Sequence, residues 1–359
     1  GLCSFRMAIV VASAALRRRA FRARLLLCGL PLPLLPMASV TGPALQESAA
    51  LCGLASASRA SASAAGAAAE QRGEAAAGVR FGDGLLDAGL LRSTSEAGFS
   101  LVLADLQAIT QGHSVVLPRR VVPRTADLSD PEFDDLWRTV RAITVSARSS
   151  GAAAANIALA DGAAAGQPIA HVHAHIVPRR PGDFEENDEV YGAIDAWRPW
   201  PAAGADTAAK ILEVPPDSER RNRLPEEMEA EAVSYREALA ATAGLELGEL
   251  PEKQMFAKIS IDRGQIFFAS ATGLTVAFVN LKPLVRGHVL VVPRRPVATL
   301  EELEDNELVD LFRSVRIIQN VLETHYGATA STLGIQDGQS AGQSVPHVHV
   351  HILPRGEVR

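Results

Sequence analysis

The stretches His347-Val-His-Val-His-Ile-Leu-Pro354 and His171-Val-His-Ala-His-Ile-Val-Pro178 decide the fold, because each alternates histidine with an apolar residue. In a β-strand successive side chains point to opposite faces. The three histidines of each stretch therefore project together, while the apolar residues face a core. A proline cannot donate to the hydrogen-bonding ladder and is expected to end each strand. We predict two strands that each present a row of three imidazoles.

A second pair of stretches repeats at nearly the same interval. The segment 111–120 returns as 286–295, with a Gly-His pair in each. His288 follows His113 by 175 residues, and the second histidine row follows the first by 176. Two spaced motifs that recur in one order at almost one offset indicate an internal duplication.

Each copy also contains a predicted helix between its two motifs. Apolar residues recur there at three- and four-residue steps, which is typical of an amphipathic helix. The stripe is Phe133, Leu136, Trp137, Val140 and Ile143 in the first copy, and Leu308, Leu311, Phe312, Val315, Ile318 and Leu322 in the second. Flanking β-branched runs predict strands. The order indicates an α+β fold, with an antiparallel sheet and packed helices in each copy.

Composition limits the class of protein. The 359 residues suffice for two domains, and the net charge of −6 argues against a nucleic-acid binder. All three cysteines lie among the first 52 residues, so the duplicated part can hold neither a disulfide framework nor a thiolate metal site.

The first 78 residues differ from the rest. Residues 1–46 contain six arginines and no acidic residue, and the stretch after them is rich in Ala, Ser and Gly. This composition predicts a chloroplast or mitochondrial transit peptide. The alternatives are a signal-peptide core at 25–35, or a disordered leader with no address on a cytoplasmic protein. The apolar run is too short to span a bilayer, so we predict no membrane span.

The chemistry of the histidine rows has two interpretations. Imidazoles at i and i+2 are good zinc ligands, but zinc needs further ligands and carboxylates around them. The residues before the second row are Gly342, Gln343 and Ser344, whose amide and hydroxyl groups suit phosphate oxygens, and Asp337 is the one acid nearby. Histidines that merely occupy a polar strand face would not explain a row that occurs twice. We favour phosphate chemistry, with no metal site, and keep metal binding as the alternative.

The geometry of a strand suggests a mechanism for the second row. The central His349 can attack phosphorus in line and form a covalent nucleotidyl–histidine. Neighbouring imidazoles and Gln343 would meet the charge that develops on the phosphoryl oxygens. An imidazole can also supply the proton that the leaving group needs, and water then releases the nucleotide.

With these residues in view, the chain resembles the histidine triad (HIT) superfamily, whose motif alternates histidine with apolar residues. It is most similar to the fragile histidine triad branch, the diadenosine triphosphate hydrolases, over residues 256–355. The resemblance implies that His349 is the nucleophile, that Asn280 contacts ribose and that Gln336 lies on the phosphate side. It also implies a nucleotide pocket formed by His288, His347, His351 and a phosphate loop of Gly342, Gln343, Ser344 and Val345.

The first copy departs from the family pattern. It keeps His113, Gln167, His171, His173 and His175, with His173 as the second candidate nucleophile. However, Asp105 occupies the asparagine position and Ala160 the glutamine position. We expect this site to be weaker or altered, and the alternative is a binding or scaffold half without turnover.

The first copy also carries the family's tail, residues 180–191 and a helix near 226–232, which the second copy lacks. Either the sequence is truncated or one tail serves both copies. We predict a leader at 1–78, a first HIT domain with its tail at 79–240, and a second HIT domain at 251–359. Family members form twofold dimers, which implies an intrachain pseudodimer, with a homodimer as the alternative.

The leading functional hypothesis is hydrolysis of dinucleoside polyphosphates, for example diadenosine triphosphate to AMP and ADP. The alternatives are a nucleoside phosphoramidase, a nucleotide phosphorylase or transferase, and a nucleotide-binding signalling module with slow turnover. The expected partner is a small-molecule nucleotide, with Mg²⁺ or Mn²⁺ accompanying it and no covalently bound cofactor.

Overall fold

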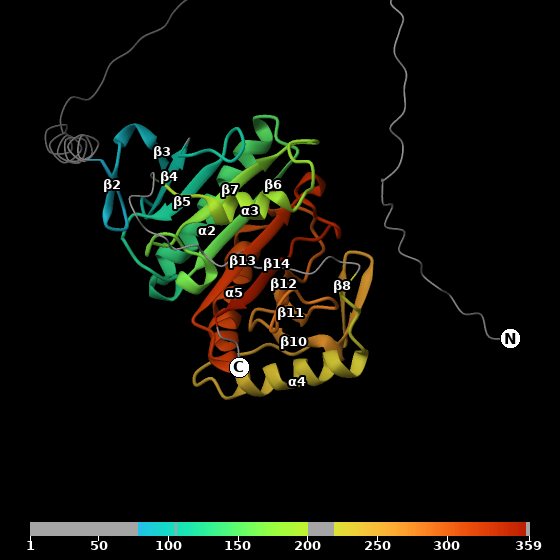
Figure 1. Ribbon diagram of the computed structural model, residues 1–359. Coiled ribbons are helices and arrows are strands. Elements are labelled where there is room, and N and C mark those ends of the chain that lie inside the picture. The colour runs from blue at the N-terminus through green and yellow to red at the C-terminus, as the bar shows by residue number, and fades with distance from the viewer. Residues whose placement is uncertain (1–77, 105, 200–218, 357–359) are drawn as a thin grey trace, which may run out of the picture. The chain divides into compact units, whose positions relative to one another are not determined.

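A single ten-stranded antiparallel sheet organises the duplicated part of the protein (Figure 1). The computed structural model describes residues 78–104, 106–199 and 219–356, so the predicted leader lies almost wholly outside it, as does Asp105. The strands, in sheet order, are β10 (Ile266–Ala269), β11 (Thr275–Val279), β12 (Val289–Pro293), β14 (Val350–Arg355), β13 (Ala330–Asp337), β6 (Ala154–Asp161), β7 (Ala174–Arg179), β5 (Ser114–Pro118), β4 (Ser100–Ala104) and β3 (Leu91–Thr94).

The two copies meet at the central pair, β6 and β13. Ser331 pairs with Asp161, and Asp337 pairs with Ala155. Asp337 and Ser331 are the duplicates of Asp161 and Ala155, so the register is unchanged when the copies are exchanged. This pseudo-twofold arrangement confirms the predicted α+β fold and intrachain pseudodimer.

The strands β7 and β14 begin at Ala174 and Val350, so only the third histidine of each row lies within its strand, which corrects the prediction of strands that carry all three. The chain before them bonds to loop carbonyls instead, through the N–H groups of Val172 and Val348. The apolar residues face the helices, as predicted. Both strands continue one residue past their proline, which corrects the predicted strand ends. Pro178 pairs with Ala155, and Pro354 pairs with Ser331. On their other side, β7 pairs with β5 only as far as Ile176, and β14 pairs with β12 only as far as Ile352. The prolines therefore lie where one side of the strand has no partner, and their missing N–H is tolerated.

Two long helices cover one face of the sheet and pack on each other (Figure 1). They are α2 (Asp130–Ser149) and α5 (Asp305–Tyr326). The rings of Trp137 and Phe312, which occupy duplicate positions, stack with centroids 3.7 Å apart and planes 7° from parallel. The predicted stripes are buried here, except that Ile143 is only partly covered.

The opposite face carries the histidines. Two small hairpins accompany it, β1 (Val79–Phe81) with β2 (Gly84–Leu86), and β8 (Lys253–Phe256) with β9 (Ile259–Asp262). The short helix α3 (Glu189–Ala196) follows β7 in the chain. Phe81 and Phe256, again duplicates, each pack edge-on against the central histidine of their own copy.

The helix α4 (Pro225–Ala240) packs against the second copy rather than the first. Its buried residues Met228, Ala232, Tyr235 and Leu239 recur at three- and four-residue steps and meet α5 and β10. We predicted that this helix is part of the first domain, residues 79–240, whereas in the structure it packs on the second copy. The apolar face of the second copy, with Phe267 and Leu322, attracts the helix, whereas Arg92 and Ala147 stand at those positions in the first. None of the helices within the described residues is long and apolar enough to cross a membrane.

Trp137→Ala should destabilise the whole assembly, because it removes half of the ring stack that joins the copies. We expect the free energy of unfolding to fall by about 3–5 kcal/mol, measured by urea denaturation. Ile143→Ala, on the same helix but partly exposed, is the control and should cost about 1 kcal/mol. A loss at Trp137 no larger than that of the control would contradict the importance of the stack.

Candidate functional site

Hydrogen bonds fix the tautomers of the second histidine row. His347 accepts from the backbone N–H of Ala257 through Nδ1 (3.1 Å), and its Nε2 donates to the carbonyl of Pro293 (2.9 Å). His349 Nδ1 lies 2.7 Å from the carbonyl of His347, so it must carry the proton. The lone pair of His349 is therefore on Nε2. His347 has no nitrogen left for a ligand and acts as the support of its neighbour.

The third histidine is oriented by His288. The N–H of Leu284 donates to His288 Nδ1 (3.0 Å), so the proton of that ring is on Nε2. Nε2 lies 2.9 Å from His351 Nδ1 and donates to it. His351 consequently holds its own proton on Nε2. The row thus combines a lone pair on one imidazole with an N–H donor on the next.

Burial keeps these imidazoles neutral. It lowers the pKa of His349 below its usual range, against the opposing effect of the bond to His347. Burial also lowers the pKa of His288 to about 3, with smaller contributions from the charges of Arg220 and Arg223. His351 is shifted well below its usual pKa by burial and then by its histidine neighbours. A neutral His349 is the protonation state that a nucleophile requires.

The predicted ribose and phosphate residues border this row. Asn280 Nδ2 lies 3.3 Å from His288 Nε2, and its Oδ1 accepts from the N–H of Lys282 (2.9 Å). Gly334 pairs with His351, so Gln336, two residues on in β13, lies on the same face of the sheet as His351. The structure thus brings Asn280, His288, Gln336 and the histidine row to one place.

The loop before the row is held in an unusual conformation. Gly342 has a φ of +88°, which a residue with a Cβ rarely adopts. The side chain of Gln343 donates to the carbonyl of Ala298 (2.8 Å) instead of being free for a ligand. The phosphate contact predicted for this side chain remains a prediction. Gln167 is held in a similar way, through the carbonyl of Pro123 and the N–H of Gly162.

The first row repeats the same internal bonds. His171 Nδ1 accepts from Gly82, and His173 Nδ1 lies 2.7 Å from the carbonyl of His171. His113 Nε2 lies 3.1 Å from His175 Nδ1. Burial lowers the pKa values of His113 and His173 to about 4. The hydrogen bonding of the central histidine is therefore equivalent in the two copies.

What differs is an indole ring that covers the first row. The centroid of Trp197 lies 4.6 Å from that of His175 and 5.8 Å from that of His173. Its Nε1 donates to the carbonyl of Leu106 (2.9 Å), and the side chain is buried. His175 is likewise buried, whereas its duplicate His351 is partly exposed. The first site is closed by its own tail.

Sequence reasoning did not identify Trp197, which follows a short helix in a segment with no recognisable pattern. It also did not identify Asn156, whose role emerges only from the sheet register. Tyr191 was noted as part of the tail, without a role.

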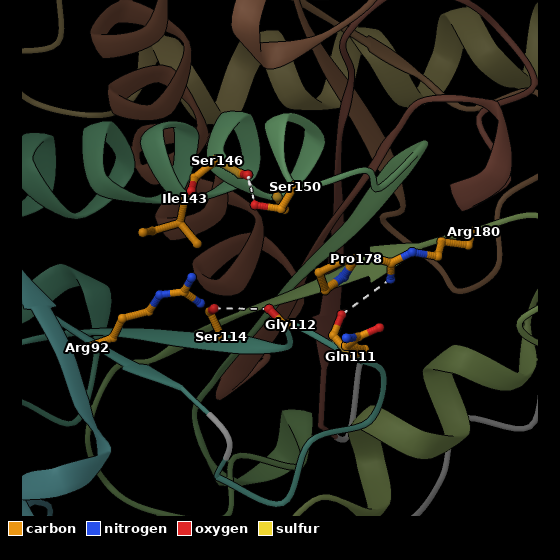
Figure 2. Close-up of a pocket in the computed structure, with 10 residues that line it drawn as sticks. Arg92, Gln111, Gly112, Ser114, Ile143, Ser146, Ser150, Pro178 and Arg180 are labelled. Atoms are coloured by element: carbon orange, nitrogen blue, oxygen red, sulfur yellow. Dashed lines mark hydrogen bonds between the residues drawn. The ribbon is translucent and has the colours of Figure 1, made fainter.

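A cavity of about 50 Å³ lies on the other face of the sheet, between α2 and β5 (Figure 2). Its lining includes Arg92, Ser114, Ser146 and Arg180, and in the second copy α4 covers the corresponding positions. It does not touch the histidine rows. Within the described parts of the chain, no group of three or more His, Cys, Asp or Glu residues is arranged to hold a metal ion.

Both copies are similar to known proteins. The HIT domain model matches residues 94–182 and 267–358. A bis(5'-nucleosyl)-tetraphosphatase (asymmetrical) of Schizosaccharomyces pombe is 53% identical over 106 residues, which are 30% of this chain and 57% of the relative. A bifunctional bis(5'-adenosyl)-triphosphatase/adenylylsulfatase of Arabidopsis thaliana is 48% identical over 100 residues, 28% of this chain and 54% of the relative. The chain thus spans little more than half the length of either.

Among solved structures, a GALT-like protein of Arabidopsis thaliana is 12% identical, with a TM-score of 0.41. The match covers 78% of this chain and 79% of that one. The two segments matched by the HIT domain model make up just over half of the sequence and coincide with the two copies of the duplicated fold. The chain therefore belongs to the HIT domain family, of which it carries two domains in tandem.

Proposed function

We propose that the second copy hydrolyses dinucleoside polyphosphates, for example diadenosine triphosphate to AMP and ADP. The observation that carries the proposal is the bond from His349 Nδ1 to the carbonyl of His347, which leaves a neutral Nε2 as the nucleophile. The names of the relatives from Schizosaccharomyces pombe and Arabidopsis thaliana support this substrate class.

The proposed reaction has two steps. His349 Nε2 attacks the α-phosphorus, and the bond from that phosphorus to the bridging oxygen of the leaving ADP breaks. The nucleotidylated ring becomes cationic, and the carbonyl of His347 stabilises its Nδ1–H. His351 Nε2–H faces the developing charge as a donor. Water then attacks phosphorus and loses a proton to the solvent, the bond from phosphorus to His349 Nε2 breaks, and AMP leaves while the lone pair returns to His349.

The alternative reactions differ from hydrolysis either in the acceptor of the nucleotidyl group or in the leaving group. Phosphate instead of water would give a phosphorylase, another nucleotide a transferase, and an amine as leaving group a phosphoramidase. A slow second step would make the protein a nucleotide-binding signalling module.

The proposal includes Mg²⁺ or Mn²⁺, bound to the phosphates of the substrate. In this scheme the first copy does not turn over, because Trp197 covers its histidines and Ala160 stands where the second copy has Gln336.

His349→Asn should abolish hydrolysis of diadenosine triphosphate, whereas His173→Asn, at the duplicate position, should leave kcat/KM within about twofold. We expect a loss of about 10³-fold or more for the first variant, because asparagine cannot form the covalent intermediate. Chromatography of the products from a panel of dinucleotides measures both. If His173→Asn alone silences the enzyme, the working half is the first copy.

The value of kcat/KM should stay constant as pH falls through the usual imidazole pKa near 6.5 and decline only below it. It reports the free enzyme, and protonation of His349 removes its nucleophilic lone pair. Because burial lowers the pKa of His349 below the usual value near 6.5, the loss is displaced to lower pH. Initial rates in matched-ionic-strength buffers test this, with far-ultraviolet circular dichroism to verify folding. An inflection at or above pH 6.5 would contradict it.

Trp197→Ala should expose the first histidine row without changing the hydrolytic rate. Diethyl pyrocarbonate modifies accessible neutral imidazoles, and peptide mass spectrometry locates the adduct. In the native protein we expect modification of His349, whose Nε2 lone pair is free and whose neighbour His351 is partly exposed, but not of His173, and in the variant modification of both. Equal reactivity of His173 in the two proteins would mean that the indole does not close the site. A rise in kcat of twofold or more in the variant would mean that the first copy can turn over.

A further inference from the structure

A buried arginine at the end of β7 organises a network that crosses from the first copy to the second. Arg179 is 2% exposed. Its Nη1 donates to Asn156 Oδ1 (2.7 Å) and to Asn187 Oδ1 (3.1 Å), and its Nε donates to Asp183 (2.9 Å). A planar guanidinium with these acceptors has little freedom to move and fixes the orientation of both amides.

Asn156 connects Arg179 to the second copy. Because its Oδ1 accepts from Arg179, its Nδ2 faces the other way and donates to the carbonyl of Ala341 (3.1 Å). Ala341 immediately precedes Gly342, the left-handed residue of the loop before the second histidine row. Asn156 also pairs in register with Gln336 across the central strands. It is 1% exposed, so no water competes for these bonds.

The tail of the first copy lies against the same loop. A Cβ placed on Gly342 would lie 2.3 Å from Asn187 Nδ2 and 3.1 Å from Gln336 Nε2, so the three groups are in close contact. The hydroxyl of Tyr191 accepts from Gln336 Nε2 at 2.9 Å. An amide nitrogen has two hydrogens, so this bond leaves one N–H of Gln336 for a phosphate oxygen.

The second copy does not support the first site in the same way. At the position of Asn156 the second copy has Thr332, whose hydroxyl accepts from Arg355 at 3.2 Å. A hydroxyl on so short a side chain does not replace an amide that binds an arginine and a carbonyl at once. At the position of Gln336 the first copy has Ala160, which has no polar group to orient. The network therefore serves one site.

We propose that Arg179, Asn156 and Tyr191 of the first copy are positioning residues for the second site. They hold Gln336 and the loop around Gly342 in the arrangement that receives the polyphosphate. This inference rests on the function proposed for the second copy. It gives the first copy a role in catalysis that does not require its own histidines to react.

Two variants of the full chain test the proposal. Tyr191→Phe removes the acceptor of Gln336 and a longer contact from Asn156 Nδ2 (3.5 Å), and Tyr191 is 36% exposed, so little packing changes. Asn156→Asp keeps the acceptor for Arg179 but sets an oxygen against the carbonyl of Ala341. We expect kcat for diadenosine triphosphate to fall about tenfold in each, with KM within about twofold, because the contacts matter most as charge develops. Thr332→Ser, at the duplicate position, is the matched control and should leave both constants unchanged.

Hydrogen exchange of the backbone provides a readout that does not depend on the substrate. Amides of residues 338–345 should exchange faster in Tyr191→Phe and Asn156→Asp than in the native protein, while those of 162–169 stay unchanged. If the native protein hydrolyses no dinucleotide but this difference appears, the proposed function fails and the positioning role remains. If the native protein is active while both variants keep its kcat and its exchange rates, the positioning role is wrong. An equal loss of kcat in Thr332→Ser would also overturn it.

Discussion

The pairing of β6 with β13 is the constraint on which the rest of the structure depends. Seven residue pairs in one antiparallel register join the two half-sheets into a continuous ten-stranded sheet. Without it each copy would expose a strand edge with unpaired backbone groups. The same register sets Asn156 beside Gln336, so the contact that assembles the fold also connects the two sites.

Charged residues reinforce this junction. Asp337 of the second copy accepts from Arg148 of the first at 2.9 Å, and Asp161 of the first copy accepts from Arg124 at 3.0 Å. Arg124 also bridges to Glu323 of the second copy. Both aspartate side chains are fully buried, so a change at either arginine would leave a buried carboxylate without its cationic partner. These pairs restrict how the copies meet, and with it the geometry of the network around Arg179.

Duplication allowed the copies to diverge while the fold stayed symmetric. The bonds within the first histidine row, such as His113 to His175, remain although Trp197 covers them. Their loss would leave buried polar atoms unsatisfied, so a structural role is enough to explain the row. The tail, by contrast, acts at two places, since Trp197 closes the first site and Tyr191 contacts Gln336 of the second.

The sequence by itself determined the duplicated α+β fold, the facing of the two histidine rows and the helical stripes, because each follows from a local period of residues. The resemblance also supplied the candidate nucleophile His349 and its neighbours. Tertiary structure alone decided that α4 packs on the second copy, that Trp197 covers the first row and that Tyr191 reaches Gln336. Tyr191 and Gln336 lie 145 residues apart, and no local pattern encodes a contact at that separation. Such contacts arise only when the sheet register brings distant segments together.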